Sequence, residues 1–226
     1  MTYSWTTLPD GRISVNNVII VPDDATSSLM KSAVIDRWGP IVEPVAAAEG
    51  VPAPWIYGFI ASESYPMGNP YSVSSAAAQG LMQIMPANFS HFYGRPVSAA
   101  EMQDPTINIT TGARMLADKR RRGLDLPTAA AEYNVGHISK SDYSDWGMYA
   151  QGCPPNDKEH SCYISNVVTR ANYAYDQTPL NPLSLSGVST SSIALGGLAL
   201  LGGASLLGYF AWKGGYYEKL RAKLRA

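Results

Sequence analysis

"DPTINITTGARMLADKRRRG", residues 104–123, is the clearest helix signal in the chain. Asp104 suits the N-cap position, and Pro105 suits the first helical position, where a missing backbone N–H costs nothing. Apolar residues recur at helical spacing on one face, namely Ile109, Ala113 and Leu116. Gly123 follows the run KRRR, whose cations suit the carboxyl end of a helix. The stretch therefore predicts a helix with one buried face and a solvated basic end.

The sequence on both sides of this stretch also favours helices. Residues 26–50 have a helical pattern, with breaks predicted at Gly39-Pro40 and at Gly50. Pro54 suits the first turn of a helix through "WIYGFIASES", residues 55–64. Pro86 suits the start of another short helix, and "LPTAAAEYNVG" (126–136) and "CYISNVVTRANYAY" (162–175) supply two more. We therefore expect a mainly α-helical domain over residues 26–176.

The first 25 residues differ in composition from this helical body. "LPDGRISVNNVIIV", residues 8–21, indicates a turn at Asp10-Gly11 followed by a strand. We expect this segment to be an arm outside the main fold. The opening "MTYSWTTLPDGRIS" lacks the basic start and apolar run of a secretory signal.

Charge is distributed unevenly along the 226 residues. The net charge of −1 argues against a nucleic-acid-binding protein, which would carry a basic surplus. The last 14 residues, "KGGYYEKLRAKLRA", nevertheless have a net charge of +4. This asymmetry predicts a basic tail, residues 213–226, that contacts an anionic surface.

An uncharged apolar segment precedes the tail. "IALGGLALLGGASLLGYFAW", residues 193–212, is 20 residues long, the length that spans a bilayer, and it ends in aromatic residues followed by Lys213. We expect a membrane-spanning helix there, with residues 177–192 as a Pro/Ser/Thr linker. A buried hairpin within an assembly is the alternative, because glycine makes the segment only moderately hydrophobic.

The two cysteines, Cys153 and Cys162, bracket a polar stretch. We favour a disulfide, which would place the domain outside a reducing cytosol. The alternatives are two reduced thiols, or a metal site that adds His160. The three histidines have no recognisable ligand spacing, so we assign no metal and no cofactor.

Glu63 stands at the end of the apolar run before "SYP". Burial disfavours a charged carboxylate, and the negative end of a helix dipole adds to this effect, so both raise the pKa. A carboxylic acid that is protonated near neutral pH is suited to protonating the leaving oxygen of a glycoside. The position of Glu63 at a helix end is by itself a weak signal, because most glutamates at helix ends are solvated.

Further motifs follow Glu63 in a fixed order. They are "ES" at 63–64, "GLMQIMP" at 80–86 and "EYNVG" at 132–136, together with "DPTINITTGARML" and "CYISNVV". This set resembles the lytic transglycosylase family, which has a goose-lysozyme-like fold, over about residues 40–176. The resemblance implies that the protein acts on peptidoglycan glycan strands.

The resemblance also implies roles for individual residues. Glu63 would be the general acid and then the base that closes a 1,6-anhydro ring. The implied substrate-binding residues are Ser74, Gly80, Met82, Gln83, Tyr133, Asn134 and Tyr163. Gly80 would let a sugar approach the backbone, and Gln83 would bind an acetamido group. Tyr163 would hydrogen-bond Glu63 and set its proton affinity.

The chain departs from the family pattern in three places. Ala77-Ala78 replaces the usual Gly-Ala, and residues 137–162 are longer and more polar than expected. Glu132 stands where the family has a small apolar residue; we expect it to face solvent, the alternative being a second carboxylate in the cleft.

Three functions follow as hypotheses. The first is a lytic transglycosylase, the second a lysozyme-type hydrolase, and the third a structural or channel-forming entry component. We expect a virion-associated protein of a phage, anchored through 193–212 and in contact with other virion proteins. The alternative is a bacterial inner-membrane enzyme with its domain in the periplasm.

Overall fold

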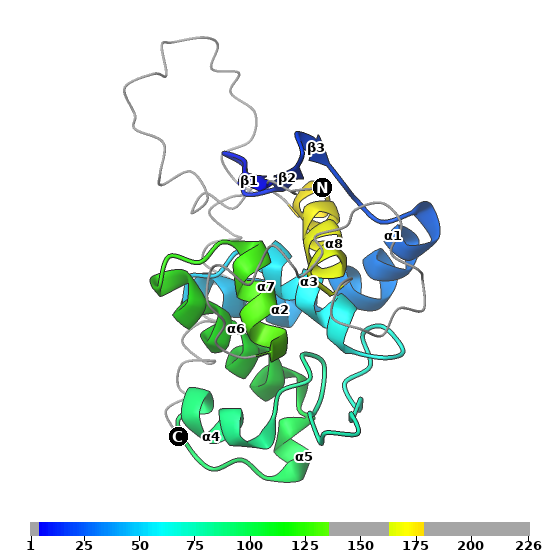
Figure 1. Ribbon diagram of the computed structural model, residues 1–226. Helices are drawn as coiled ribbons and strands as arrows, with labels where there is room; N and C mark the ends of the chain where they lie inside the picture. Colours follow the sequence, from blue (N-terminus) through cyan, green and yellow to red (C-terminus); the bar gives the residue numbers. More distant parts are fainter. Residues whose placement is uncertain (1–4, 136–162, 179–226) are drawn as a thin grey trace, which may run out of the picture. The chain divides into compact units, whose positions relative to one another are not determined.

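Helices dominate the computed structural model, which describes residues 5–135 and 163–178 (Figure 1). In chain order they are α1 (Asp24–Met30), α2 (Arg37–Glu49), α3 (Ala53–Glu63), α4 (Pro86–Tyr93), α5 (Ala99–Met102), α6 (Pro105–Arg121), α7 (Leu126–Val135) and α8 (Tyr163–Gln177). A π-helical turn, η1 (Lys31–Asp36), joins α1 to α2. Three short strands, β1 (Trp5–Thr7), β2 (Ile13–Val15) and β3 (Val18–Ile19), precede them. The predicted mainly helical domain is confirmed.

Helix α6 begins and ends as its sequence predicts. The Asp104 carboxylate accepts hydrogen bonds from the backbone N–H groups of Thr106 (2.9 Å) and Ile107 (3.0 Å). Pro105 occupies the first position, and Gly123 follows the helix with a φ of +80°. The predicted apolar face is buried, with Ile109 and its neighbours on α6 packed toward α2 and α4. Local capping chemistry therefore sets both ends.

The predicted break at Gly39-Pro40 is wrong, because helix α2 is continuous there. It runs through Gly39 and Pro40 instead of breaking there, and it ends at Gly50, which adopts a left-handed conformation with a φ of +69°. Pro40 lies in the first turn of α2, directly after the π-helical turn. Proline lacks the N–H that would bond four residues back, and the wider π-turn lies where that bond is missing.

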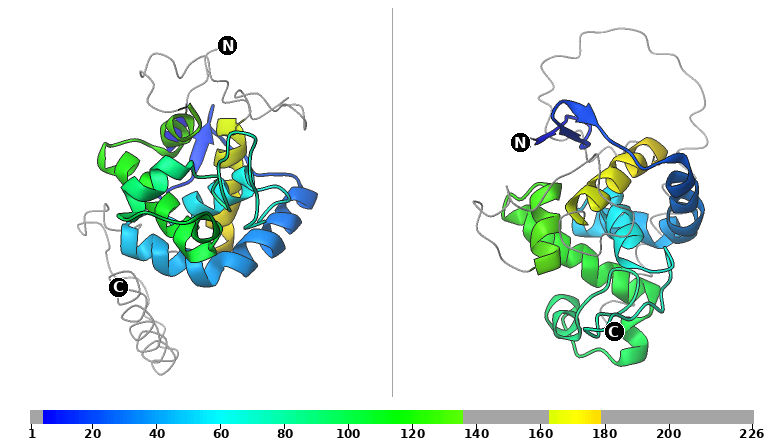
Figure 2. Two further views of the ribbon diagram at one scale, coloured as in Figure 1. Left: turned by 90° about the horizontal axis from the view of Figure 1, so that it is seen from below. Right: turned by 45° about the vertical axis from the view of Figure 1, so that its right-hand side comes forward.

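Helix α3 is the central helix of the domain. All eight residues from Pro54 to Ala61 are buried, which is the pattern of a helix covered on every side. Its most extensive neighbour is α8, and the views of Figure 2 show α8 (yellow) lying against it. Gly58 makes this approach close, because a Cβ there would lie 2.8 Å from the Val167 carbonyl oxygen. Two segments about a hundred residues apart thus pack as one unit.

The N-terminal segment forms an antiparallel sheet in the order β1-β2-β3. Val15 pairs with Val18 across Asn16-Asn17, which both have positive φ angles, as a tight two-residue hairpin requires. The strand predicted after Asp10-Gly11 is present as β2.

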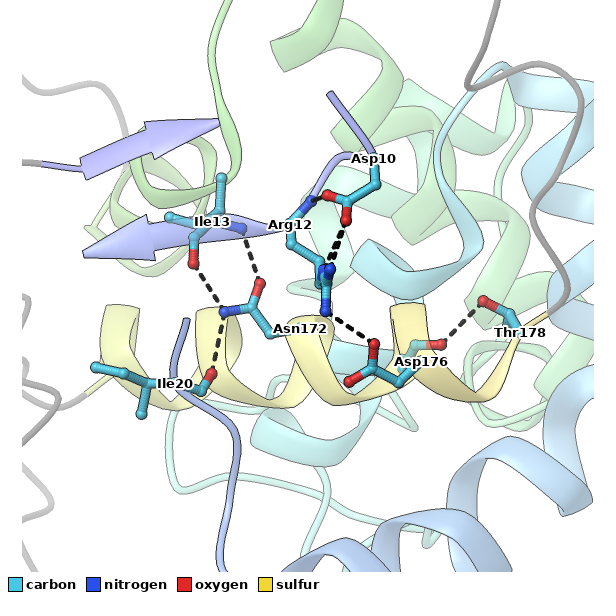
Figure 3. A network of polar contacts seen from close by, with 8 residues as sticks. Asp10, Arg12, Ile13, Ile20, Asn172, Asp176 and Thr178 are labelled. Atoms are coloured by element: carbon cyan, nitrogen blue, oxygen red, sulfur yellow. Dashed lines mark hydrogen bonds and ion pairs between the residues drawn. The ribbon is translucent and has the colours of Figure 1, made fainter. Parts of the chain in front are cut away.

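Contrary to expectation, this sheet is not an arm outside the main fold. Asn172 of α8 accepts a hydrogen bond from the Ile13 N–H (2.8 Å) and donates to the carbonyl oxygens of Ile13 (2.9 Å) and Ile20 (3.0 Å) (Figure 3). Arg12 adds an ion pair with Asp176 at 3.0 Å. Since all three residues of β2 are buried, the sheet packs onto the domain through β2.

Residues 193–212, the basic tail 213–226 and all but the first two residues of the linker lie outside the described residues. Within residues 5–135 and 163–178, no helix has the length and apolar character needed to cross a membrane.

Candidate active site

Glu63 is the last residue of α3, and Ser64 ends the helix in an extended conformation. The Ser64 hydroxyl donates to the Ile60 carbonyl oxygen (2.7 Å) and accepts from the Gly68 N–H (2.7 Å). These bonds close the helix end and turn the chain away directly after Glu63. The carboxylate is therefore held on a rigid, buried helix at the point where the chain reaches the surface loop.

Tyr163, the first residue of α8, donates a hydrogen bond to the Glu63 carboxylate. Burial raises the pKa of Glu63 to about 7, and the Tyr163 hydroxyl opposes this rise. The predicted hydrogen bond and the predicted direction of the pKa shift are thus both present. The tyrosine is itself affected, because burial and the nearby carboxylate raise the pKa of its hydroxyl well above the ordinary value.

Arg170 follows Tyr163 by seven residues, about two turns of α8. Sequence reasoning did not identify it. Its guanidinium donates to the Ala61 carbonyl oxygen (3.0 Å) and to the Ser62 hydroxyl (2.9 Å), just before Glu63. Burial lowers the pKa of Arg170, and the charge of Arg170 opposes the rise in the pKa of Tyr163. Its spacing of seven residues from Tyr163 places both on one face of α8, which is the signal that could have identified it.

The loop between α3 and α4 contains the Gly80–Gln83 motif. Gln83 has a φ of +44°, and its side-chain N–H₂ group donates to the carbonyl oxygens of Ser72 (2.9 Å) and Gly80 (2.9 Å). The Gln83 side-chain N–H₂ group therefore holds the loop backbone in shape, a role that was not predicted. The predicted binding of an acetamido group stays a prediction.

Asn108 of α6 holds this loop from below. Its side chain accepts from the Met82 N–H (2.9 Å) and donates to the carbonyl oxygens of Gln79 (2.9 Å) and Met102 (2.8 Å). A Cβ at Gly80 would collide with the Asn108 amide. The position that a Cβ would occupy at Gly80 is therefore filled by Asn108, which gives this glycine a structural role; that it also makes room for a sugar stays a prediction.

Met82 and Tyr133 connect the loop to α7. The Met82 side chain is fully buried against Gly112 of α6, so its position is that of a packing residue. The Tyr133 hydroxyl donates to the Met82 carbonyl oxygen (2.8 Å), and its ring lies 4.6 Å from the Phe59 ring of α3 between centroids. Burial and the charge of Glu63 raise the pKa of Tyr133, which places the two side chains in one electrostatic environment.

The remaining predicted residues fall in three places. Ser74 accepts a hydrogen bond from the Ala78 N–H (3.0 Å) and shapes the loop. Asn134 is exposed on α7. Cys153 and Cys162 lie outside the described residues, as does the whole segment 137–162. Residues 5–135 and 163–178 contain no group of three or more acidic, histidine or cysteine side chains that could hold a metal ion.

Glu132 corrects another expectation. It is buried, with 4% of its surface exposed, and does not face solvent. Its carboxylate pairs with Arg122 at 2.5 Å and with Lys119 at 3.6 Å, both at the end of α6. A buried carboxylate needs such partners, and the basic run that ends α6 supplies them. The second-carboxylate alternative is disfavoured too, because the group is committed to two cations.

Comparison with known proteins agrees with this arrangement. Residues 41–147 match the family described as the transglycosylase SLT domain. A transglycosylase of Enterobacteria phage PRD1 is 29% identical over 52% of this chain and 40% of its own length. An endo-type membrane-bound lytic murein transglycosylase A of Klebsiella pneumoniae is 39% identical over 36% of this chain and 42% of its own length. The chain thus spans less than half the length of either relative.

Solved structures show the same fold. The lytic transglycosylase Slt of Pseudomonas aeruginosa, an inactive mutant, gives a TM-score of 0.51 at 23% identity over 69% of this chain and 26% of the other. The 70-kDa soluble lytic transglycosylase in complex with bulgecin A gives 0.53 at 21% identity over 72% of this chain and 27% of the other. Together with the match of residues 41–147, just under half of the chain, this shows that the chain is similar to the transglycosylase SLT domain in sequence and in fold.

Proposed function

We propose that the protein is a lytic transglycosylase that cleaves the β-1,4 bond between N-acetylmuramic acid and N-acetylglucosamine in peptidoglycan. The similarity of residues 41–147 to the transglycosylase SLT domain and the names of the relatives support this reaction. The observation that carries the proposal is Glu63, a helix-end carboxyl group with a pKa near 7 and a hydrogen bond from Tyr163.

The first half of the reaction needs a proton donor at neutral pH. With a pKa of about 7, roughly half of the Glu63 side chains carry a proton at pH 7. At the ordinary value of 4.5, about one in 300 would do so. Glu63 gives this proton to the glycosidic oxygen, the bond from that oxygen to the muramoyl anomeric carbon breaks, and N-acetylglucosamine leaves with a free hydroxyl group.

The second half needs a base and a nucleophile. Glu63, now ionised, accepts the proton of the muramoyl 6-hydroxyl as that oxygen bonds to the anomeric carbon, which closes the 1,6-anhydro ring and restores the acid. The substrate's acetamido group stabilises the positive centre, so a second protein carboxylate is unnecessary. The ion pairs of Glu132 with Arg122 and Lys119 favour this scheme over one with a second carboxylate base.

Substrate contacts are proposed for the surrounding residues. Tyr133 and Asn134 of α7, with Gln83 and Ser74 of the loop, would bind the sugars on either side of the broken bond. Tyr163 would hold the Glu63 carboxyl group in position for both proton transfers. Met82 and Gly80 would contribute through the shape of the loop, since both are buried by protein atoms.

We further propose a place of action. The protein would be carried by a phage particle and would open the host wall locally during entry, with residues 193–212 as its anchor. Support comes from the phage relative and from the apolar and basic character of residues 193–226. Recovery of the protein in the inner-membrane fraction of uninfected cells would contradict this proposal.

Purified murein tests the reaction. The wild type should release fragments with 1,6-anhydro ends, which weigh one water less than hydrolysis products, and Glu63→Gln should release none. Glu101→Gln is the matched control, because Glu101 is bonded to Ser98 and Arg95 of a surface segment. Reducing ends from the wild type would identify a hydrolase instead, and undiminished lysis by Glu63→Gln would rule out Glu63 as the acid.

A further inference from the structure

The loop after Glu63 exposes an unusual amount of apolar surface. Tyr65 is 88% exposed and Tyr71 is 71% exposed, the two highest values among the large hydrophobic side chains of the described residues. Val73 and Met85 of the same segment are also exposed. Large exposed side chains gathered on one segment indicate a binding surface more often than single ones do.

The two tyrosines come from adjoining backbone positions. Ser72, next to Tyr71, accepts a hydrogen bond from the Tyr65 N–H (2.9 Å) and donates one to the Tyr65 carbonyl oxygen (2.8 Å). The Asn69 carboxamide oxygen accepts from the Tyr71 N–H at 3.1 Å. The backbone on which both rings stand is therefore bonded into one unit.

This unit also lies between the two parts of the candidate active site. The Ser72 carbonyl oxygen accepts hydrogen bonds from the Gly80 N–H (2.8 Å) and from the Gln83 side chain (2.9 Å). On its other side, Tyr65 follows Glu63 by two residues. A ligand that contacts Glu63 and Gln83 thus has the tyrosine-bearing backbone beside it.

The loop is anchored at its base as well. The Trp38 indole N–H donates to the Gly68 carbonyl oxygen (3.1 Å), and the Gly68 N–H donates to the Ser64 hydroxyl (2.7 Å). A Cβ at Gly68 would collide with the Ala33 carbonyl oxygen, so the loop is pressed onto η1. Since the backbone is already ordered, little entropy is lost when the exposed rings bind a ligand.

We propose that Tyr65 and Tyr71 form an aromatic platform that stacks against a sugar ring of the glycan strand, outside the bond that Glu63 breaks. This inference rests on the proposed function. A pyranose ring has an apolar C–H face that suits an aromatic face, while its hydroxyl groups and the tyrosine hydroxyls stay in water. The continuity of the platform with Glu63 and Gln83 argues for the glycan strand as its occupant.

Binding is measured in a Glu63→Gln background, so that turnover does not interfere. Co-sedimentation with purified murein should weaken roughly 3- to 10-fold for Tyr65→Ala and for Tyr71→Ala, the range expected of one aromatic contact. Phenylalanine at either position should restore binding, because the ring face is kept. Leu29→Ala is the control, since Leu29 is half exposed on α1 and lies outside the platform.

Two further arms decide between outcomes. Murein stripped of its peptide stems should show the same loss, and a loss confined to stem-bearing murein would overturn the sugar assignment. Unchanged binding by the double alanine variant would overturn the platform altogether.

In the active background, Tyr65→Ala should raise KM and leave the anhydro product unchanged. An absence of anhydro product in the wild type would refute the proposed function, whereas the binding arms test the platform separately.

Discussion

Replacing Glu63 by glutamine should stabilise the protein at alkaline pH. Burial raises the pKa of Glu63 from the ordinary 4.5 to about 7, so the folded state resists losing this proton. The unfolded chain loses it freely above pH 4.5. The wild type therefore has its full stability below pH 4.5 and loses part of it as the pH rises through 7. Glutamine keeps the shape and an oxygen acceptor for Tyr163 but has no proton to lose.

The size of this effect follows from the pKa shift. At about 1.4 kcal/mol per pKa unit, the rise to about 7 corresponds to about 3 kcal/mol in the free energy of unfolding. Glu63→Gln should gain nearly this amount at pH 8 and almost nothing at pH 4. A gain of about 3 kcal/mol moves a urea midpoint by about 1 M or more.

Urea unfolding of both proteins at pH 8 and pH 4 is the assay. Glu101→Gln is a control of opposite sign. Hydrogen bonds from Arg95 and Ser98 lower the pKa of Glu101 to about 2, so its contribution is present above pH 4.5 and lost as the pH falls toward 2. That variant should be less stable than the wild type at pH 8. Equal midpoint shifts for Glu63→Gln at both pH values would refute the reasoning.

Three further predictions concern single side chains. Tyr163→Phe removes a hydrogen bond that lowers the pKa of Glu63, so the alkaline limb of the pH–rate profile on murein should move to higher pH while the rate falls. Gly80→Ala should destabilise the protein more than Gly94→Ala in urea unfolding. Both glycines have a positive φ, but an added Cβ collides with the Asn108 amide at Gly80, whereas at Gly94 it meets nothing within 4 Å. Asn172→Ala removes the side-chain partner of three backbone groups, of which the two on Ile13 are buried and the one on Ile20 is part-buried; this should cost about 2–3 kcal/mol and expose the N-terminal sheet to limited proteolysis.

Local signals made the helices of this chain predictable. The start of α6 depends on Asp104 and Pro105, and the end of α2 depends on Gly50, all of which act within a few residues of their own position. Glu63 and Tyr163 were found by resemblance to a family, and the buried character of the preceding helix predicted the direction of the Glu63 pKa shift.

Contacts between distant segments were not predictable in the same way. Asn172 docks the N-terminal sheet through backbone groups about 150–160 residues away, and a single asparagine in a helical pattern gives no sign of that. Asn108 likewise contacts a loop that precedes it by more than twenty residues. Glu132 appeared to face solvent because its partners, Arg122 and Lys119, were assigned to a solvated helix end.

The chemistry of Glu63 depends on how closely α3 and α8 approach. Gly58 admits the α8 backbone, and its missing side chain leaves room for Ala171, whose Cβ would lie 3.0 Å from an added Cβ. Next to Ala171, Arg170 donates hydrogen bonds to the Ala61 carbonyl oxygen and the Ser62 hydroxyl near the end of α3, and these bonds fix the position of α8 along α3. Because Glu63 ends one helix and Tyr163 begins the other, the same packing buries the carboxyl group and delivers its hydrogen-bond donor. A larger residue at position 58 would separate the helices, hydrate the carboxyl group and return its pKa toward 4.5, where it no longer holds a proton at neutral pH.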